Sequence, residues 1–234
     1  MATLLAIETS SNVCSVALCK DGVVLAVKNS SEKNAHSKTL TLMILELLEK
    51  CKISKNTINA VAVSKGPGSY TGLRIGVSVA KGLCYGWDKP LIAVDTIKAL
   101  AAEYLLKHVE KKNESENVLL CPMFDARRME VYTALYKKDL TEVLPVQALV
   151  VDEFCLSDYL KENKILFFGN GASKCSEIIK SVNASFFTDI EPSARGVAYL
   201  AEELYNQKQF VDTAYFEPFY LKEFIAGKSS RKMF

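Results

Sequence analysis

The chain has 234 residues, of which 49% are hydrophobic and 24% are charged, and its formal net charge is +2 at pH 7. This composition is typical of a globular protein with one large domain or two ordinary ones. It argues against an autonomous nucleic-acid-binding protein, which would carry a broad positive field. Without a membrane-spanning run or a signal peptide, and with seven cysteines in no framework spacing, we expect a cytoplasmic protein that binds no membrane and keeps its thiols reduced.

Strand and helix signals alternate regularly in the first half. Apolar runs predict strands, an apolar periodicity of 3.6 residues predicts helices, and Asp21-Gly22 predicts a tight hairpin turn. A charged stretch over 107–117 predicts a boundary between a domain of residues 1–110 and a domain of residues 111–234. The elements expected before it are strands 3–8, 12–19, 23–28, 59–64 and 91–95 and helices 36–52, 72–87 and 96–107, the last capped by Thr96.

A glycine-rich segment over 64–76 follows the fourth strand and reads Ser-Lys-Gly-Pro-Gly-Ser-Tyr-Thr-Gly-Leu-Arg-Ile-Gly. A loop between a strand and a helix can present backbone N–H groups to an anion. The segment lacks the Gly-Lys-Ser/Thr ending of a Walker loop and the G-x-G-x-x-G spacing of a dinucleotide fingerprint. It therefore predicts either an anion-binding loop or a tight turn without a ligand.

The helices before and after this loop lack a clean polar face. In the second, four glycines each cost about 1 kcal/mol relative to alanine, so packing must stabilise the helix. In the first, two leucines lie outside the main apolar face. Either the helices are wedged inside the fold, or they form an apolar face for another subunit. The second interpretation predicts an interface of Lys38, Leu42, Leu45, Glu49, Gly72, Ile75, Gly76, Val79, Gly82, Leu83 and Gly86.

The second half of the chain repeats the order of the first. Glu8 and Asp125 both end a strand and are both followed nine residues later by Ala-Leu. The repetition predicts two duplicated β-β-β-α-β-α halves that face each other across a cleft. The elements expected are strands 118–125 and 130–136, an extended region around Pro145, helix 152–161, strand 165–168 and helices 172–180 and 194–206.

Five segments carry a family resemblance. The most specific is 66–76, and the others are 5–10, 15–18, 125–132 and 218–221. Over residues 3 to 222 the chain resembles the bacterial TsaB (YeaZ) family, within the actin/Hsp70-like superfamily (ASKHA, RNase H-like). The resemblance implies an α/β fold of two actin/Hsp70-like halves with mixed central sheets.

The resemblance implies a non-catalytic subunit in the synthesis of N6-threonylcarbamoyladenosine (t6A) on tRNA. The implied partners are the catalytic paralogue TsaD or a second copy of the chain, bound through the first two helices, together with the ATPase TsaE and, through the complex, tRNA. TsaD binds a metal through H-x-x-x-H after its glycine-rich helix, whereas residues 94–101 here contain no histidine. This favours a helper without transferase activity and without the peptidase activity that the family's glycoprotease-like (M22) label suggests.

A second hypothesis is an ATP-binding enzyme, an ATPase or kinase, with its nucleotide site between the halves and acids that position Mg²⁺. Against it, the second acid turn has Ala126 and Arg127 where the first has Thr9 and Ser10. We expect no metal site and no cofactor bound by the chain alone, and ATP with Mg²⁺ only in the complex. The candidate nucleotide-site residues are Glu8, Thr9, Ser10, Asp125, Arg127, Gly169 and Gly171.

Charged residues near the second acid turn and the C-terminus have simpler interpretations. Arg127 and Arg128 are expected to pair with Asp125 and Glu130. The family's C-terminal Tyr-Leu-Arg appears here as Tyr-Leu-Lys at 220–222, which keeps the charge but loses the planar guanidinium. The basic segment that follows, 227–232, is interpreted either as a solvated tail or as a contact with tRNA phosphates.

Overall fold

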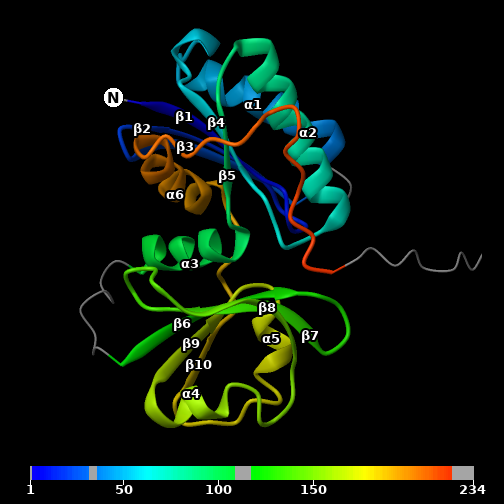
Figure 1. The fold of residues 1–234 in the computed structure, drawn as a ribbon, viewed down its shortest axis with the longest axis vertical. Helices are drawn as coiled ribbons and strands as arrows, with labels where there is room; N and C mark the ends of the chain where they lie inside the picture. Colours follow the sequence, from blue (N-terminus) through cyan, green and yellow to red (C-terminus); the bar gives the residue numbers. More distant parts are fainter. Residues whose placement is uncertain (1, 32–35, 109–116, 223–234) are drawn as a thin grey trace, which may run out of the picture.

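The computed structural model describes residues 2–31, 36–108 and 117–222 (Figure 1). In the first half the elements are β1 (Thr3–Glu8), β2 (Cys14–Lys20), β3 (Val23–Ser30), α1 (His36–Lys50), β4 (Ala60–Ser64), α2 (Tyr70–Trp87), β5 (Leu91–Val94) and α3 (Thr96–Lys107). In the second half they are β6 (Val118–Asp125), β7 (Glu130–Tyr136), β8 (Glu142–Val150), α4 (Ser157–Glu162), β9 (Lys164–Phe168), α5 (Ala172–Cys175), β10 (Ala184–Phe187) and α6 (Ala194–Asn206).

Two mixed sheets of the same topology organise the described residues. The first has the order β3-β2-β1-β4-β5 and the second the order β10-β9-β6-β7-β8, which is the same arrangement counted from the other edge. In each sheet the first strand of the half pairs antiparallel with the second strand and parallel with the fourth. The predicted duplication is confirmed, and each half adds a fifth strand and a third helix to the predicted unit.

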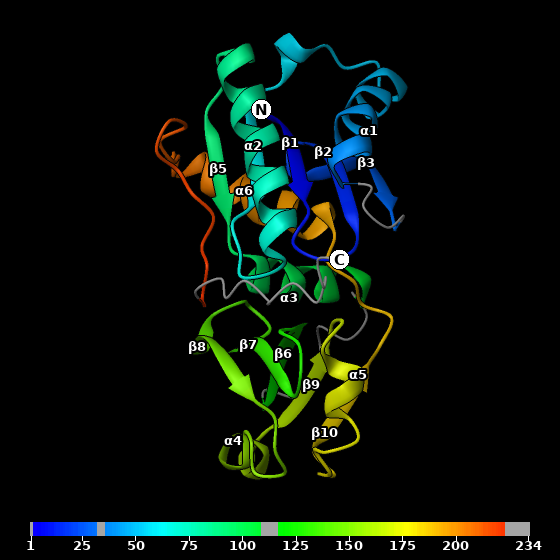
Figure 2. The ribbon, with the colours of Figure 1, turned by 90° about the vertical axis from the view of Figure 1, so that its right-hand side faces the viewer.

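The first sheet is covered by helices on both faces, and its central strand is therefore buried throughout. Leu5 and Ile7 point into a cluster with the buried sides of α1 and α2. Leu4 and Ala6 point the other way, into a cluster with α3 and α6. Figures 1 and 2 show α1 and α2 together on one side of this sheet and α6 on the other.

The two halves share a hydrophobic core through α3, which lies between them in Figure 1. One cluster contains Leu100 of α3, Phe124 of the second sheet and Val197 of α6. Although α6 ends the second half, it packs on the first sheet and on α3. The expected domain boundary between 110 and 111, and the basic segment 227–232, lie outside the described residues.

Several element ends differ from the sequence-based expectation. α4 begins at Ser157 instead of 152, because the Asp152 carboxylate accepts the N–H of Phe154 in a turn at 2.9 Å. α5 ends at Cys175 instead of 180, and the short edge strand β10 was not predicted. The other predicted strands and helices are confirmed, with their ends shifted by at most two residues.

The cap of α3 is Asp95 and not Thr96. Asp95 Oδ1 accepts hydrogen bonds from the N–H groups of Ile97 and Lys98, at 3.0 and 3.1 Å. The Thr96 hydroxyl is used elsewhere, because it accepts the N–H of Gly66 at 2.9 Å. In the part of the chain that the structure describes, no helix combines the length and apolar character needed to cross a membrane.

Candidate functional site

The glycine loop between β4 and α2 is packed against its own chain. The N–H of Gly66 donates to Thr96 Oγ1, that of Ser69 donates to the carbonyl of Ser10 at 2.6 Å, and that of Gly72 donates to Ser69 Oγ at 3.3 Å. These are donors that an anion would need. Because they are used inside the chain, the structure supports the interpretation of the loop as a tight turn without a ligand.

The first two glycines of α2 lie on its buried side. A Cβ on Gly72 would be 2.0 Å from the carbonyl oxygen of Thr9, and a Cβ on Gly76 would be 2.1 Å from Thr9 Oγ1. Their missing side chains allow α2 to approach the turn between β1 and β2. We therefore correct the expectation that Gly72 and Gly76 belong to a partner interface.

The first acid turn, which contains Glu8, Thr9 and Ser10, is closed to solvent. Glu8 is 1% exposed, and its Oε1 accepts both the N–H of Ser10, at 2.6 Å, and the Ser10 hydroxyl. Burial raises the pKa of Glu8 above its usual range, an effect that these hydrogen bonds offset only in part. A Cβ on Gly68 would lie 2.6 Å from the Ser10 side chain, so the glycine loop covers the turn. Such a carboxylate offers no open position to a hydrated Mg²⁺.

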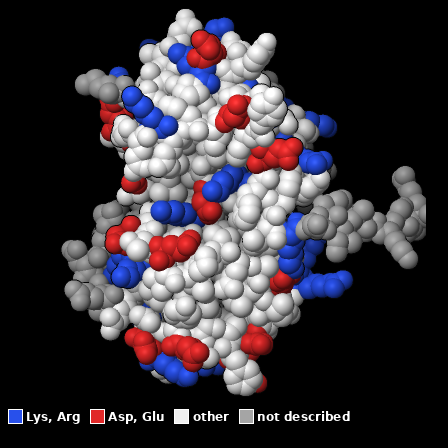
Figure 3. Space-filling view, viewed as in Figure 1, with Lys and Arg blue, Asp and Glu red and all other residues white. Residues whose placement is uncertain are grey.

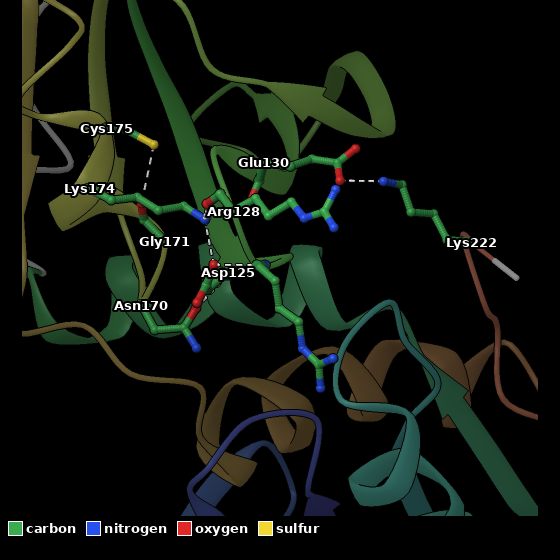
Figure 4. A network of polar contacts seen from close by, with 9 residues as sticks. Asp125, Arg128, Glu130, Asn170, Gly171, Lys174, Cys175 and Lys222 are labelled. Carbon is green, nitrogen blue, oxygen red and sulfur yellow. Dashed lines mark hydrogen bonds and ion pairs between the residues drawn. The ribbon is translucent and has the colours of Figure 1, made fainter. Parts of the chain in front are cut away.

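The second acid turn is neutralised by a lysine (Figure 4). The Lys174 ammonium pairs with the Asp125 carboxylate and donates to the carbonyl oxygens of Arg128 and Glu130, at 2.8 and 2.7 Å. Three oxygens thus surround one ammonium group at the place where a nucleotide-binding protein would need a free acid. The lone lysine in a short helix gave no sequence signal for this contact.

The carboxylates of this turn are paired, but not by the predicted arginines. Glu130 forms an ion pair with Lys222, a residue from the C-terminal segment (Figure 4). Arg127 contributes its backbone N–H to Asp125, at 2.9 Å. The expectation that the Arg127 and Arg128 guanidinium groups pair with these acids is therefore wrong.

The loop after β9 supports the same turn. Gly169 and Gly171 are buried, and a Cβ on Gly169 would lie 2.5 Å from the carbonyl of Met123. Between them, Asn170 accepts the N–H of Asp125 at 2.9 Å. The structure therefore brings Asp125, Gly169 and Gly171 together, with Arg127 in the same turn as Asp125. The remaining candidate nucleotide-site residues, Glu8, Thr9 and Ser10, lie in the first acid turn.

The outward side of α1 and α2 exposes several large apolar side chains among polar ones. Leu42 is 55% exposed, Leu45 is 60% exposed and Tyr85, which was not among the predicted interface residues, is 90% exposed. Ile75, Val79 and Leu83 are half-buried, because they also contact the core below the helices. We call this surface the pairing face; it comprises Lys38, Leu42, Leu45, Glu49, Ile75, Val79, Gly82, Leu83, Tyr85 and Gly86.

Two glycines on the pairing face have no packing reason within the chain. A Cβ on Gly82 or Gly86 would meet no atom within 4 Å, in contrast to the buried glycines at the start of the same helix. Each glycine costs about 1 kcal/mol in a helix interior. Their backbone is accessible to close approach by another molecule.

A C-terminal strap over residues 207–222 runs from α6 past α2 to the second half. The N–H of Val211 donates to the carbonyl of Leu91 on β5 at 2.9 Å, and Lys81 of α2 donates to two strap carbonyls. Farther on, Tyr220 contacts Arg74 at 3.2 Å. Because the next ion pair joins Lys222 to Glu130, the strap connects the two halves.

Neither the distribution of surface charge nor the potential metal ligands indicate a further site in the described part of the chain. Lys and Arg side chains are interspersed with Asp and Glu over the face shown in Figure 3, in agreement with the small net charge. Among the described residues, no group of three or more His, Cys, Asp or Glu side chains could hold a metal ion.

Comparison with known proteins identifies the family. The family model of TsaD, tRNA N6-adenosine threonylcarbamoyltransferase, matches residues 24–226. The chain is 34% identical over 183 residues to the tRNA threonylcarbamoyladenosine biosynthesis protein TsaB of Bacillus subtilis strain 168, covering 77% of this chain and 76% of that protein. It is 30% identical over 237 residues to TsaB of Haemophilus influenzae, covering 97% and 96%. The chain belongs to the TsaB family.

A solved structure of a TsaB (YeaZ) relative has the same fold. The crystal structure of a Pseudomonas aeruginosa protein, described as uncharacterized with similarity to the peptidase YeaZ, superposes with a TM-score of 0.79. It is 26% identical and covers 95% of this chain and 100% of its own. The predicted family and the predicted actin-like α/β fold are confirmed.

Proposed function

We propose that the chain is a non-catalytic subunit of t6A synthesis that binds a TsaD-type catalytic paralogue through the pairing face and activates it. Membership of the TsaB family supports a role in tRNA t6A biosynthesis, and the match to the TsaD model supports a TsaD-type partner. The observation that carries the proposal is the group of exposed apolar side chains on α1 and α2, together with the two open glycines of α2.

The pairing face can contribute substantially to association. Full burial of a leucine side chain stabilises a complex by about 1.5–3 kcal/mol. Leu42 and Leu45 are each more than half exposed, so covering both in a complex would contribute about 2 kcal/mol. The open glycines at 82 and 86 allow a partner helix to approach α2 at the short end of the usual interaxial range, about 8 Å.

The chain alone is proposed to hold neither nucleotide nor Mg²⁺, and ATP is proposed to act only in the assembled complex. The acid turns support this part of the proposal, since Glu8 is buried in a hydrogen-bond network and Asp125 is paired with Lys174. These residues do not fit a magnesium-nucleotide site of the kind that the ATP-binding alternative needs. A TsaE-type ATPase and tRNA would join through the complex, in the cytoplasm.

Light scattering after size-exclusion chromatography tests the proposal, on this chain alone and mixed with its TsaD-type paralogue. The same fractions are assayed for t6A formation with threonylcarbamoyl-adenylate and tRNA. We expect a stable complex that is active only when both chains are present. No complex, together with tight binding of Mg·ATP by this chain alone, would contradict the proposal and support the ATP-binding enzyme.

A further inference from the structure

The second acid turn surrounds the Lys174 ammonium group with three oxygen atoms. They belong to the Asp125 carboxylate and to the backbone carbonyls of Arg128 and Glu130. The two carbonyls accept hydrogen bonds from the ammonium group at 2.8 and 2.7 Å, and the carboxylate forms an ion pair with it. Because an ammonium group has three N–H donors, this arrangement can satisfy all of them. We call the three oxygens the oxygen cage (Figure 4).

The oxygen cage is also held by hydrogen bonds that do not involve the lysine. The Asp125 carboxylate accepts the backbone N–H of Arg127 at 2.9 Å. The Glu130 carbonyl accepts the N–H of Ala126 at 3.1 Å. On the other side of the turn, the backbone N–H of Asp125 donates to the Asn170 side chain at 2.9 Å. These bonds keep the carboxylate and one carbonyl in place when the ammonium group is removed.

The backbone of the cage is strained. Arg127 and Arg128 have φ angles of 68° and 50°, in the left-handed region that residues other than glycine rarely adopt. The second of these residues contributes its carbonyl oxygen to the cage. Since such a conformation persists only where surrounding contacts fix it, the bound ammonium group is one of the contacts that hold this turn.

The charge and the size of the cage select the kind of cation. The cage contains a single carboxylate, because the Glu130 carboxylate is paired with Lys222, so one positive charge neutralises it. Its carbonyl distances of 2.7 and 2.8 Å are those of charge-assisted hydrogen bonds. Mg²⁺ needs oxygens at about 2.1 Å and Ca²⁺ at about 2.4 Å, and both ions take at least about six ligands. The cage therefore fits an ammonium group better than a divalent metal ion.

We infer that the oxygen cage is a binding site for a primary ammonium ion, and that Lys174 fills this site with its own side chain. The tethered ammonium group holds the second acid turn closed, so the turn needs no ion from solution. The site is separate from the pairing face, which lies on α1 and α2 in the first half. The inference does not depend on the TsaD-type partner, so either proposal can fail without the other.

Removal of the lysine side chain tests whether the cage binds a free ammonium ion. Lys174→Ala keeps Cβ and removes the atoms that correspond to n-propylammonium. Because the Lys174 side chain is only 22% exposed, the space that it leaves is largely enclosed and open at one side. We expect the melting temperature of the variant to fall by about 4 °C. n-Propylammonium chloride should restore at least about half of this loss in a saturable way, because it binds only the folded chain.

Two further variants serve as controls. Lys161→Ala is the matched control, because the Lys161 ammonium pairs with a single exposed carboxylate, that of Asp158, and has no cage. Lys174→Met loses the charge but keeps a long side chain that fills the space. We expect n-propylammonium to restore stability in neither variant and to leave the wild-type chain unchanged.

Thermal unfolding followed by circular dichroism measures all variants in n-propylammonium chloride, and in sodium, tetramethylammonium and magnesium chloride at equal ionic strength. Recovery of Lys174→Ala in n-propylammonium alone supports the inference. The inference is overturned if Lys174→Ala is as stable as the wild type. Equal recovery in sodium or tetramethylammonium chloride, the same response of Lys161→Ala, or recovery only with Mg²⁺ would also overturn it.

Discussion

Two glycines of α2, about 9 Å apart along the helix at its rise of about 1.5 Å per residue, should respond oppositely to the same substitution. Gly82→Ala adds a methyl group where no atom lies within 4 Å, so the monomer gains the full difference in helix propensity, about 1 kcal/mol. Gly76→Ala gains the same propensity, but its Cβ would lie 2.1 Å from Thr9 Oγ1 in a buried contact. Overpacking costs about 1–3 kcal/mol, so Gly76→Ala should lower stability.

Urea unfolding, monitored by circular dichroism, measures both effects at a concentration where the chain is monomeric. A third variant, Gly82→Leu, separates folding from pairing. A Cβ at this position has open space around it in the monomer, so the substitution should leave the urea midpoint at or above the wild-type value. In the complex it holds the partner helix away from α2, and we expect binding of the TsaD-type paralogue to weaken at least about tenfold, or about 1.4 kcal/mol.

Destabilisation of the monomer by Gly82→Ala would contradict this prediction, because Gly82 would then pack within the chain. Wild-type affinity of the Gly82→Leu variant for the paralogue would also contradict it, since the open glycine would then have no role in the interface. Gly76→Ala is the control that shows that the assay detects a steric clash on the same helix.

Three further predictions follow from other parts of the structure. Leu45→Asp should leave the monomer folded and weaken binding of the TsaD-type paralogue about tenfold, because an exposed leucine is lost from the pairing face. Titration calorimetry measures the affinity, and an unchanged value would exclude Leu45 from the interface. Glu8→Gln should flatten the pH dependence of stability. Because burial raises the pKa of Glu8, the unfolding free energy of the wild type falls by about 1.4 kcal/mol for each unit that the pH rises between the usual pKa of a glutamate and this raised pKa. Equal slopes for the wild type and the variant, measured by urea unfolding at several pH values, would contradict this prediction. Arg195→Met should cost about 3 kcal/mol of unfolding free energy by leaving the buried Glu103 carboxylate unpaired, and a neutral result would show that Glu103 is neutralised otherwise.

The class of the fold could be predicted because local patterns determine it. The continuous apolar run of β1 indicates a strand covered on both faces, and the matching positions of Glu8 and Asp125 indicate duplication. The placement of α6 on the first sheet could not be predicted, because periodicity shows which side of a helix is buried and not what covers it.

In the candidate site, too, features of a single helix could be predicted from the sequence, whereas contacts between residues far apart in the sequence could not. Gly76 and Gly82 have the same sequence signature, and only the contact with Thr9 distinguishes a packing glycine from an open one. Lys174, which pairs with Asp125, lies 49 positions away from it in the sequence. The sequence alone therefore favoured the neighbouring arginines as the partners of this acid, which is wrong. Leu42 and Leu45 were predicted as outward residues, because two leucines opposite the main apolar side are a local feature of one helix.

Whether this chain activates the TsaD-type paralogue is measured by t6A formation when the paralogue is titrated with this chain, in parallel with the Leu45→Asp variant. We expect no product with either protein alone, saturation at one chain per paralogue, and a titration shifted to higher concentration for the variant. Full activity of the paralogue alone, or an identical titration with the variant, would contradict it.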